Sequence, residues 1–470
     1  MADSMPTLAD ESVAVHFPNS SQAEDEQKAS AGSETANSLS APQDESAARP
    51  SAAEELKVLV PRSQKLTLFF LAAGKTLTAT TLRMLFPFAP ELGRAVNVSL
   101  EAIALVITGH EVAYLLASSL TAFPLKAGYS NLTVCSVALA FAATGLLLIA
   151  ALPRHIAVLA MGVPLLGVGK GISDVAIQGY ITTNVFAEVQ GTVTGAVEVS
   201  WGMASFVGLP IAGVLFAVAY RAPFACFAAC QAVLCVCLAL RRGGASTKHD
   251  VQTATPTTQQ DSEEEPVVSW RALLLSKRGA LGLIIPTFFL IAAAHIFFML
   301  IGVWLEEIHH MSTTEIGTTS LVVGVADVLG ELTVARLGDR MGAHRLRNAS
   351  YLCAVSLFFL FGLTCQAPLG LSLGAWFLCV LSFEVAFVSS LAMSSKEWPN
   401  SNGRAESAVF FAVGAGTIAG SLAGAPLWDL HPRLPALHTA GLVAGGMTTI
   451  GCVCAFVGTR PPPPSSSSSK

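Results

Sequence analysis

Twelve apolar stretches, separated by short polar segments, fill the chain from about Gln64 to Val457. Each is long enough to cross a membrane as a helix, because a hydrocarbon core needs about 20 apolar residues per helix. The predicted helices cover approximately residues 64–88, 100–122, 131–151, 156–181, 191–217, 221–240, 279–304, 314–336, 347–366, 369–393, 404–428 and 436–458. The pattern therefore predicts an all-α membrane protein with twelve transmembrane helices.

Polar segments divide these helices into two groups of six. Residues 1–62 are rich in Ser, Glu and Asp, and we predict a disordered acidic cytoplasmic tail because so few apolar groups are available for burial. Residues 242–276 form a predicted cytoplasmic linker between one bundle at 63–241 and a second bundle at 277–458. The Pro- and Ser-rich residues 459–470 predict a disordered cytoplasmic tail.

Similar sets of small residues and proline occur in the fifth and the eleventh predicted helix. The fifth contains Gly202, Gly208, Pro210 and Gly213, and the eleventh contains Gly414, Gly420, Gly424 and Pro426. Gly208 aligns with Gly420 when Gly191 is laid on Gly403. Small residues also recur wherever membrane helices pack closely. Because helix number, spacing and loop length agree as well, we predict two pseudo-symmetric six-helix bundles.

Composition supports the membrane assignment and excludes other classes. The chain is 52% hydrophobic and 13% charged, with a mean hydropathy of +0.59, which is far too apolar for a soluble protein. The net charge of -5 arises largely in the acidic N-terminal tail, and without a basic face nucleic acid is excluded as a partner. The 10 cysteines lie in or at the ends of apolar runs, so we predict no disulfide framework, no metal site and no cofactor. Motifs of nucleotide-binding loops, serine hydrolases and zinc proteases do not occur, so we predict no enzyme activity.

Lys and Arg residues beside the predicted helices are unevenly distributed. If both termini are cytoplasmic, the inner segments hold sixteen of these residues and the outer loops hold four, namely Arg94, Arg154, Arg221 and Arg433. Short cytoplasmic loops are enriched in Lys and Arg. We therefore predict that both termini are cytoplasmic, and we place the protein in the plasma membrane.

Charged residues inside the predicted helices are the candidates for a functional site. We select Lys75, Arg83, Glu111, Lys170, Asp174, Asp327 and Glu384. A charge in the hydrocarbon core costs several kcal/mol unless it is paired or faces water, so such residues are rare without a function. The three cations could receive an anionic substrate, or they could neutralise Glu111, Asp174 and other acids, and the sequence leaves both alternatives open.

Helical spacing distinguishes two pairs among these residues. Lys170 and Asp174 are i,i+4 neighbours, so they can neutralise each other on one helix face. Asp327 and Glu331 have the same spacing, but two like charges favour protonation of one of them. The second pair is therefore a candidate for proton binding, with Glu331 alternatively a partner of Arg336 or Arg340.

Glu111 and Glu384 have no cation on their own helix. A carboxylate isolated at the middle of a membrane is either protonated or matched by a residue of another helix, which suits a residue that binds and releases a proton. His110 and His295 also lie inside predicted helices, where a histidine often simply bonds to a neighbouring helix.

The predicted link between the eighth and ninth helices reads Asp339-Arg340-Met341-Gly342-Ala343-His344-Arg345. It resembles the Asp-Arg-x-Gly-x-x-Arg signature of the major facilitator superfamily. The resemblance implies a conformational latch formed by Asp339, Arg340, Gly342 and Arg345. The corresponding link between the second and third helices retains only Lys126 and Gly128, with Leu125 in place of the acid, so we expect a weakened latch there.

The fifth helix provides a second resemblance. Gly208, Pro210 and Gly213, preceded by Gly202, resemble the Gly-Pro motif of exporting, proton-antiporting branches of the superfamily, and Arg83-Met84 with Phe86-Pro87 is similar to sugar-efflux-type and drug-efflux-type permeases.

Together these resemblances cover about residues 64–458. They imply the major facilitator fold and a monomeric secondary active transporter in the lipid bilayer. It would move a small organic solute by alternating access, with protons as the coupling ion and export as the direction. The alternatives are an uncoupled facilitator or importer, and a membrane receptor or scaffold that does not transport.

Overall fold

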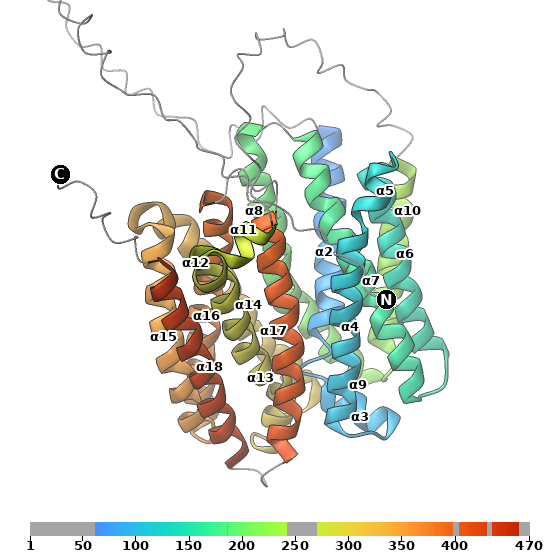
Figure 1. The fold of residues 1–470 in the computed structure, drawn as a ribbon. Coiled ribbons are helices and arrows are strands. Elements are labelled where there is room, and N and C mark those ends of the chain that lie inside the picture. The colour runs from blue at the N-terminus through green and yellow to red at the C-terminus, as the bar shows by residue number, and fades with distance from the viewer. Residues whose placement is uncertain (1–61, 186, 242–269, 398–403, 430–434, 460–470) are drawn as a thin grey trace, which may run out of the picture. The chain divides into compact units, whose positions relative to one another are not determined.

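Helices make up nearly all of the described chain. The structure is a computed structural model that describes residues 62–185, 187–241, 270–397, 404–429 and 435–459, and those ranges contain no β-strand. The predicted tails lie outside these ranges apart from Arg62 and Thr459, and so does the predicted linker up to residue 269. Figure 1 shows the helices running side by side.

The N-terminal half consists of six long helical segments. They are α2 (Arg62–Arg83), α4 (Leu100–Leu120), α6 (Asn131–Ala151), α7 (Ile156–Asn184), a fifth segment made of α8 (Ala187–Met203), a π-helical turn η1 (Ala204–Gly208) and α9 (Leu209–Val218), and α10 (Ala222–Arg241). Two short helices, α3 (Ala89–Val96) and α5 (Ala122–Lys126), lie in the links before and after α4. The first predicted helix ends five residues early, at Arg83 instead of residue 88, because the turn before α3 contains Pro87, which disfavours helical backbone at the residue before it.

The C-terminal half repeats the pattern of six. It contains α13 (Ile285–Glu307), α14 (Thr313–Met341), α15 (Ala343–Thr364), α16 (Leu369–Glu397), α17 (Arg404–Asp429) and α18 (Pro435–Thr459). The short helices α11 (Trp270–Leu275) and α12 (Lys277–Gly279) and a π-helical turn η4 (Ala280–Ile284) precede α13. The last residues of the predicted linker are thus helical.

Ten of these helical segments are long and apolar enough to cross a membrane within the described residues. The two remaining long helices, α2 and α14, complete the predicted set of twelve. Both carry charged candidates inside their spans, Lys75 and Arg83 on α2 and Asp327 on α14.

Equivalent helices of the two halves make equivalent contacts. In the N-terminal half α6 packs on α7 and α10, and in the C-terminal half α15 packs on α16 and α18. Across the halves, the second helix of each half packs on the fifth segment of the other, since α4 contacts α17 and α14 contacts α9. The fold is therefore the predicted all-α fold of two pseudo-symmetric six-helix bundles.

The paired glycines lie at equivalent close contacts between helices. A Cβ atom at Gly202 would lie 2.9 Å from Val328 of α14, and one at Gly414 would lie 2.7 Å from Leu115 of α4. A Cβ atom at Gly208 would clash with Thr80 of α2, and one at Gly420 would clash with the backbone of α13. Since α2 and α13 are the first long helices of their halves, the contacts follow the same pseudo-symmetry.

Gly213 and Pro210 complete the predicted packing motif of the fifth segment. A Cβ atom at Gly213 would lie 2.9 Å from the Cα atom of Gly317, so α9 and α14 approach with their backbones almost in contact. Pro210 stands in the first turn of α9, directly after the π-helical turn η1.

Among the described residues, the hydrophobic core that the two halves share lies at one end of the bundles. We call this the α3 end, because α3 lies there, and the opposite end of α4 the α5 end (Figure 1). The largest cluster joins both halves, and its N-terminal members all come from the α3 end, for example Phe88, Phe216 and Phe224. At that end Arg94 also forms a 2.5 Å ion pair with Glu306 of α13.

At the α5 end the described residues form separate cores. One cluster contains residues of the N-terminal half alone, including Leu71, Ile177 and Leu238. Two smaller clusters contain residues of the C-terminal half alone, around Leu273 and Leu346. Within the described residues, the halves therefore share a hydrophobic core at the α3 end, whereas at the α5 end the buried residues of the N-terminal half cluster apart from those of the C-terminal half.

A methyl group at Gly420 is expected to destabilise the protein, because the helix backbones must separate to admit it. Gly420→Ala should lower the free energy of unfolding by about 1–3 kcal/mol, the usual cost of overpacking. The control is Gly446→Ala on α18, where no atom lies within 4 Å of the added carbon and helix propensity favours Ala by about 0.5–1 kcal/mol. Thermal unfolding in detergent measures both, and equal behaviour of the two variants would contradict the packing role.

Candidate functional site

An ion pair between the two halves lies at the centre of the candidate residues. The Arg83 guanidinium, on the last residue of α2, donates to the carboxylate of Asp327 on α14 and to the hydroxyl of Ser205 in η1. The side chains of Arg83 and Asp327 are only 13% and 1% exposed. A buried charge is costly without a partner, so each of the two residues depends on the other.

The π-helical turn η1 explains why Ser205 reaches this pair. Pro210 has no backbone N–H and cannot bond to the carbonyl of Phe206, four residues earlier, so regular α-helical bonding is interrupted there. Turns of this kind are rare and frequently occur at functional sites. Here the turn faces Arg83 with the hydroxyl of Ser205.

An aromatic ring lies between two of the candidate cations. The Arg83 guanidinium lies 4.4 Å from the centre of the Trp201 ring, and the Lys170 ammonium lies 5.1 Å from the same ring. Lys170 also lies 4.7 Å from the ring of Tyr114 and pairs with Asp174 at 2.5 Å. The predicted i,i+4 pair thus forms on α7, and Trp201 connects it to the Arg83–Asp327 pair.

The third candidate cation also has an acidic partner. The Lys75 ammonium lies 2.6 Å from the Glu198 carboxylate, which accepts a further 3.0 Å hydrogen bond from Gln178. Lys75 is buried, whereas the Glu198 side chain is 42% exposed. The exposed face of Glu198 makes this the candidate pair with the most open access.

Glu384 is a buried carboxyl with an unsatisfied oxygen. It is 2% exposed, and its Oε2 atom has no hydrogen-bond partner among the described residues. Its Cβ lies against α14 at Gly330, where an added Cβ atom would be 2.8 Å away. Asp327, Glu331 and Arg83 all lie within electrostatic range of this carboxyl.

Glu111 is paired within its own helix. The carboxylate of this buried residue lies 3.0 Å from Nδ1 of His110. His295 lies within electrostatic range of Glu111, but its ring bonds elsewhere, to the Ile291 carbonyl at 3.0 Å and to the Thr417 hydroxyl of α17 at 3.3 Å. The contact to α17 matches the alternative in which a membrane histidine joins neighbouring helices.

The predicted latch residues lie where α14 meets α15. The two helices are separated by a single residue, Gly342, whose φ of 83° favours glycine. Arg340 and Arg345 are exposed on either side of it. The side chain of Asp339 lies outside the described part of the structure.

The structure brings together most of the sequence candidates and adds residues that the sequence analysis missed. Each of the three cations faces an acid, as in the neutralisation alternative. Trp201, Tyr114 and Ser205 were not selected because aromatic and hydroxyl residues are common in membrane helices. The spacing along the helix could have indicated Trp201 and Ser205, because they follow Glu198 by three and seven residues and so lie on the same helix face.

The fold and the sequence identify the family of this chain. A family model described as Major Facilitator Superfamily matches residues 71–421 and again residues 283–470. The chain belongs to the Major Facilitator Superfamily, and it is an integral, multi-pass membrane protein.

A relative that is itself described as a transporter of this family has a similar sequence. The chain is 25% identical over 260 residues to a Bacillus subtilis (strain 168) protein described as uncharacterized MFS-type transporter YceJ. That match covers 54% of this chain and 63% of the relative, so the chain spans less than two thirds of the relative's length.

Solved structures share the fold. A D-xylose-proton symporter matches 84% of this chain and 97% of its own, with 12% identity and a TM-score of 0.65. The nucleoside transporter NupG matches 84% and 99%, with 14% identity and a TM-score of 0.63. At these identities the similarity shows the fold alone.

Removing one partner of the Arg83–Asp327 pair should cost much more than removing both. Arg83→Gln or Asp327→Asn alone leaves one buried charge uncompensated, and we expect each to lower the free energy of unfolding by about 3–5 kcal/mol. The double variant should recover much of that loss. Thermal unfolding of all three variants in detergent provides the measurement.

The control for these three variants is Arg94→Gln, which breaks the ion pairs of Arg94 with Glu91 and Glu306. The Arg94 side chain is 53% exposed, so the cost should be about 0–1 kcal/mol. Strictly additive losses in the double variant would show that Arg83 and Asp327 do not depend on each other.

Proposed function

We propose that this chain is a secondary active transporter that moves a small organic solute by alternating access, coupled to protons and in the direction of export. The observation that carries the proposal is the buried ion pair between Arg83 of one bundle and Asp327 of the other. Candidate residues of both bundles surround it, which is the arrangement expected for a solute site between two structural repeats.

The location of the pair supports a role in alternating access. Leu82 and Ala326, the chain neighbours of Arg83 and Asp327, belong to the core that both halves share at the α3 end. The pair therefore borders the contact that must open for a solute to leave on that side. A ligand that competes for Asp327 weakens a link between the bundles and favours their separation at the α3 end.

Proton coupling is supported by the surplus of carboxyl groups. Asp327, Glu331 and Glu384 lie within electrostatic range of Arg83, and Glu331 also lies within range of Lys75, which is itself paired with Glu198. Four carboxylates cannot all be neutralised by two cations in a medium of low polarity, so the cluster can hold a proton. We assign that proton to Glu384, whose Oε2 atom has no hydrogen-bond partner in the described part of the chain.

The predicted orientation supports export as the proposed direction. With both termini cytoplasmic, α2 begins on the cytoplasmic side and the α5 end faces the cytoplasm. The halves have separate cores at that end, which suits entry of a solute from the cytoplasm. Solute and proton then exchange across the plasma membrane, and a monomer is sufficient for this cycle.

A thermal-shift screen of the purified protein identifies the solute, because binding to the native state alone raises the unfolding temperature. The panel should contain sugars, nucleosides, organic acids, amino acids and organic cations. A hit is then tested for flux in proteoliposomes with an imposed proton gradient. Absence of binding and flux for every class would support the receptor or scaffold alternative.

Neutralising Glu384 should uncouple solute movement from protons. In proteoliposomes, Glu384→Gln is expected to reduce gradient-driven flux of the solute by about 5–150-fold, the range of a typical coupling between two ligands. Exchange of solute without a gradient should remain within about twofold of wild type, because the amide keeps the shape of the side chain.

The matched control is Glu307→Gln, which removes an exposed carboxylate at the end of α13. This variant should retain gradient-driven flux. If Glu384→Gln behaves like the control, then Glu384 does not carry the proton. If wild-type flux is itself insensitive to the gradient, the uncoupled facilitator is correct.

A further inference from the structure

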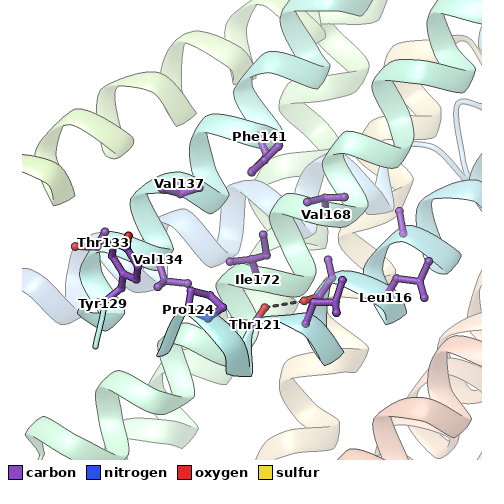
Figure 2. Close-up of a pocket in the computed structure, with 13 residues that line it drawn as sticks. Leu116, Thr121, Pro124, Tyr129, Thr133, Val134, Val137, Phe141, Val168 and Ile172 are labelled. Atoms are coloured by element: carbon purple, nitrogen blue, oxygen red, sulfur yellow. Dashed lines mark hydrogen bonds between the residues drawn. The ribbon is translucent and has the colours of Figure 1, made fainter. Parts of the chain in front are cut away.

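A groove of about 610 Å³ lies between α4, α5, α6 and α7, away from the candidate residues. Figure 2 shows Leu116 of α4, Val137 and Phe141 of α6, and Val168 and Ile172 of α7 pointing into a common space. Tyr129 and Thr133 line it near the link that joins α5 to α6. The groove is therefore almost entirely apolar, with Tyr129 and Thr133 near its α5 end.

The side chains around this groove are exposed to the medium beside the helices. Leu116 is 61% exposed, Leu120 is 58% exposed and Phe141 is 40% exposed. An apolar depression of this size on a soluble protein would be an interaction site. On a membrane-spanning helix the same surface faces acyl chains.

Charge at the α5 end of the groove indicates which lipid fits it. Lys126 ends α5, two residues after Pro124 of the groove wall, and is exposed. It forms no ion pair within the described residues. The exposed ring of Tyr129 lines the groove beside it. Lys126 does not itself line the groove, but it lies in the chain between Pro124 and Tyr129, which both do. A cation and a phenol near one end of an apolar groove are complementary to a negatively charged headgroup.

We propose that this groove binds an anionic phospholipid of the bilayer, with one acyl chain between α4 and α6 and the phosphate at Lys126 and the Tyr129 hydroxyl. The site occupies the link in which only Lys126 and Gly128 of the superfamily latch are retained. The lipid holds together the three segments of that link, α4, α5 and α6. This inference does not depend on the solute or on proton coupling.

Lipid retention by the full-length protein tests the proposal. The protein is purified in detergent, incubated with equal amounts of phosphatidylglycerol and phosphatidylcholine, and analysed by native mass spectrometry. Wild type should retain phosphatidylglycerol about fivefold better, as expected for one basic residue near the membrane surface. Lys126→Gln should remove this preference and leave the unfolding temperature without added lipid unchanged.

Two further variants make the result specific to the groove. Arg278→Gln removes another exposed cation at the α5 end, in the C-terminal half, and should retain the preference. Ala113→Phe fills the groove from α4 while Lys126 remains, and should also remove the preference. The unfolding temperature and the elution volume of Ala113→Phe show whether this variant keeps its fold. If it does not, the lipid preference of Lys126→Gln alone decides whether the groove binds an anionic lipid.

Equal retention of both lipids by wild type would overturn the proposal, because the groove would then contain only non-selective lipid. An unchanged preference in Lys126→Gln would also overturn it. So would a dimer that Ala113→Phe dissociates, since a second copy of the chain would then occupy the groove.

Discussion

A guanidinium and a carboxylate, both largely removed from solvent, connect the two halves of this protein. Burial makes each of these charges dependent on the other, because neither can regain its hydration without movement of a helix. The remaining charged residues are arranged around this constraint. Arg83 and Lys170 both lie near the ring of Trp201, which so links two ion pairs.

Close helix contacts determine where this pair can form. Gly208 allows α2 to pack closely on the fifth segment, and Gly202 allows α14 to pack closely on the same segment. The helices that carry Arg83 and Asp327 therefore meet at η1. Gly420 and Gly414 give the second half the equivalent contacts with α13 and α4. The repeated glycines therefore serve a structural purpose in both halves, whereas the ion pairs of the described residues include one between α2 and α14 and none between the equivalent helices α13 and α4.

The two predicted latch links also occupy equivalent positions but differ in their charged residues. The link at Gly342 retains the charged pattern of the superfamily, with Arg340 and Arg345 exposed. The equivalent link has lost its acid and instead carries Lys126 beside an apolar groove. This link has no acid that could pair locally with Lys126, and for this reason we propose a partner from outside the protein for its charge.

Much of the fold was predictable from the sequence, because hydrophobic length and spacing are local properties. The twelve helices, their division into two groups of six and the alignment of Gly208 with Gly420 all follow from such patterns. The ion pair of Lys170 and Asp174 was predictable for the same reason, since both residues lie on one face of one helix.

The tertiary structure alone decided the remaining contacts. Arg83 is 244 residues from Asp327, and Lys75 reaches Glu198 from another helix, so no spacing along the chain reveals these partners. The unsatisfied oxygen of Glu384 and the position of Trp201 between two cations likewise depend on how separate helices rotate against one another. The sequence determined which residues must avoid lipid, because the cost of a charge in hydrocarbon belongs to the residue itself, whereas their partners depend on packing between helices that are distant in the chain.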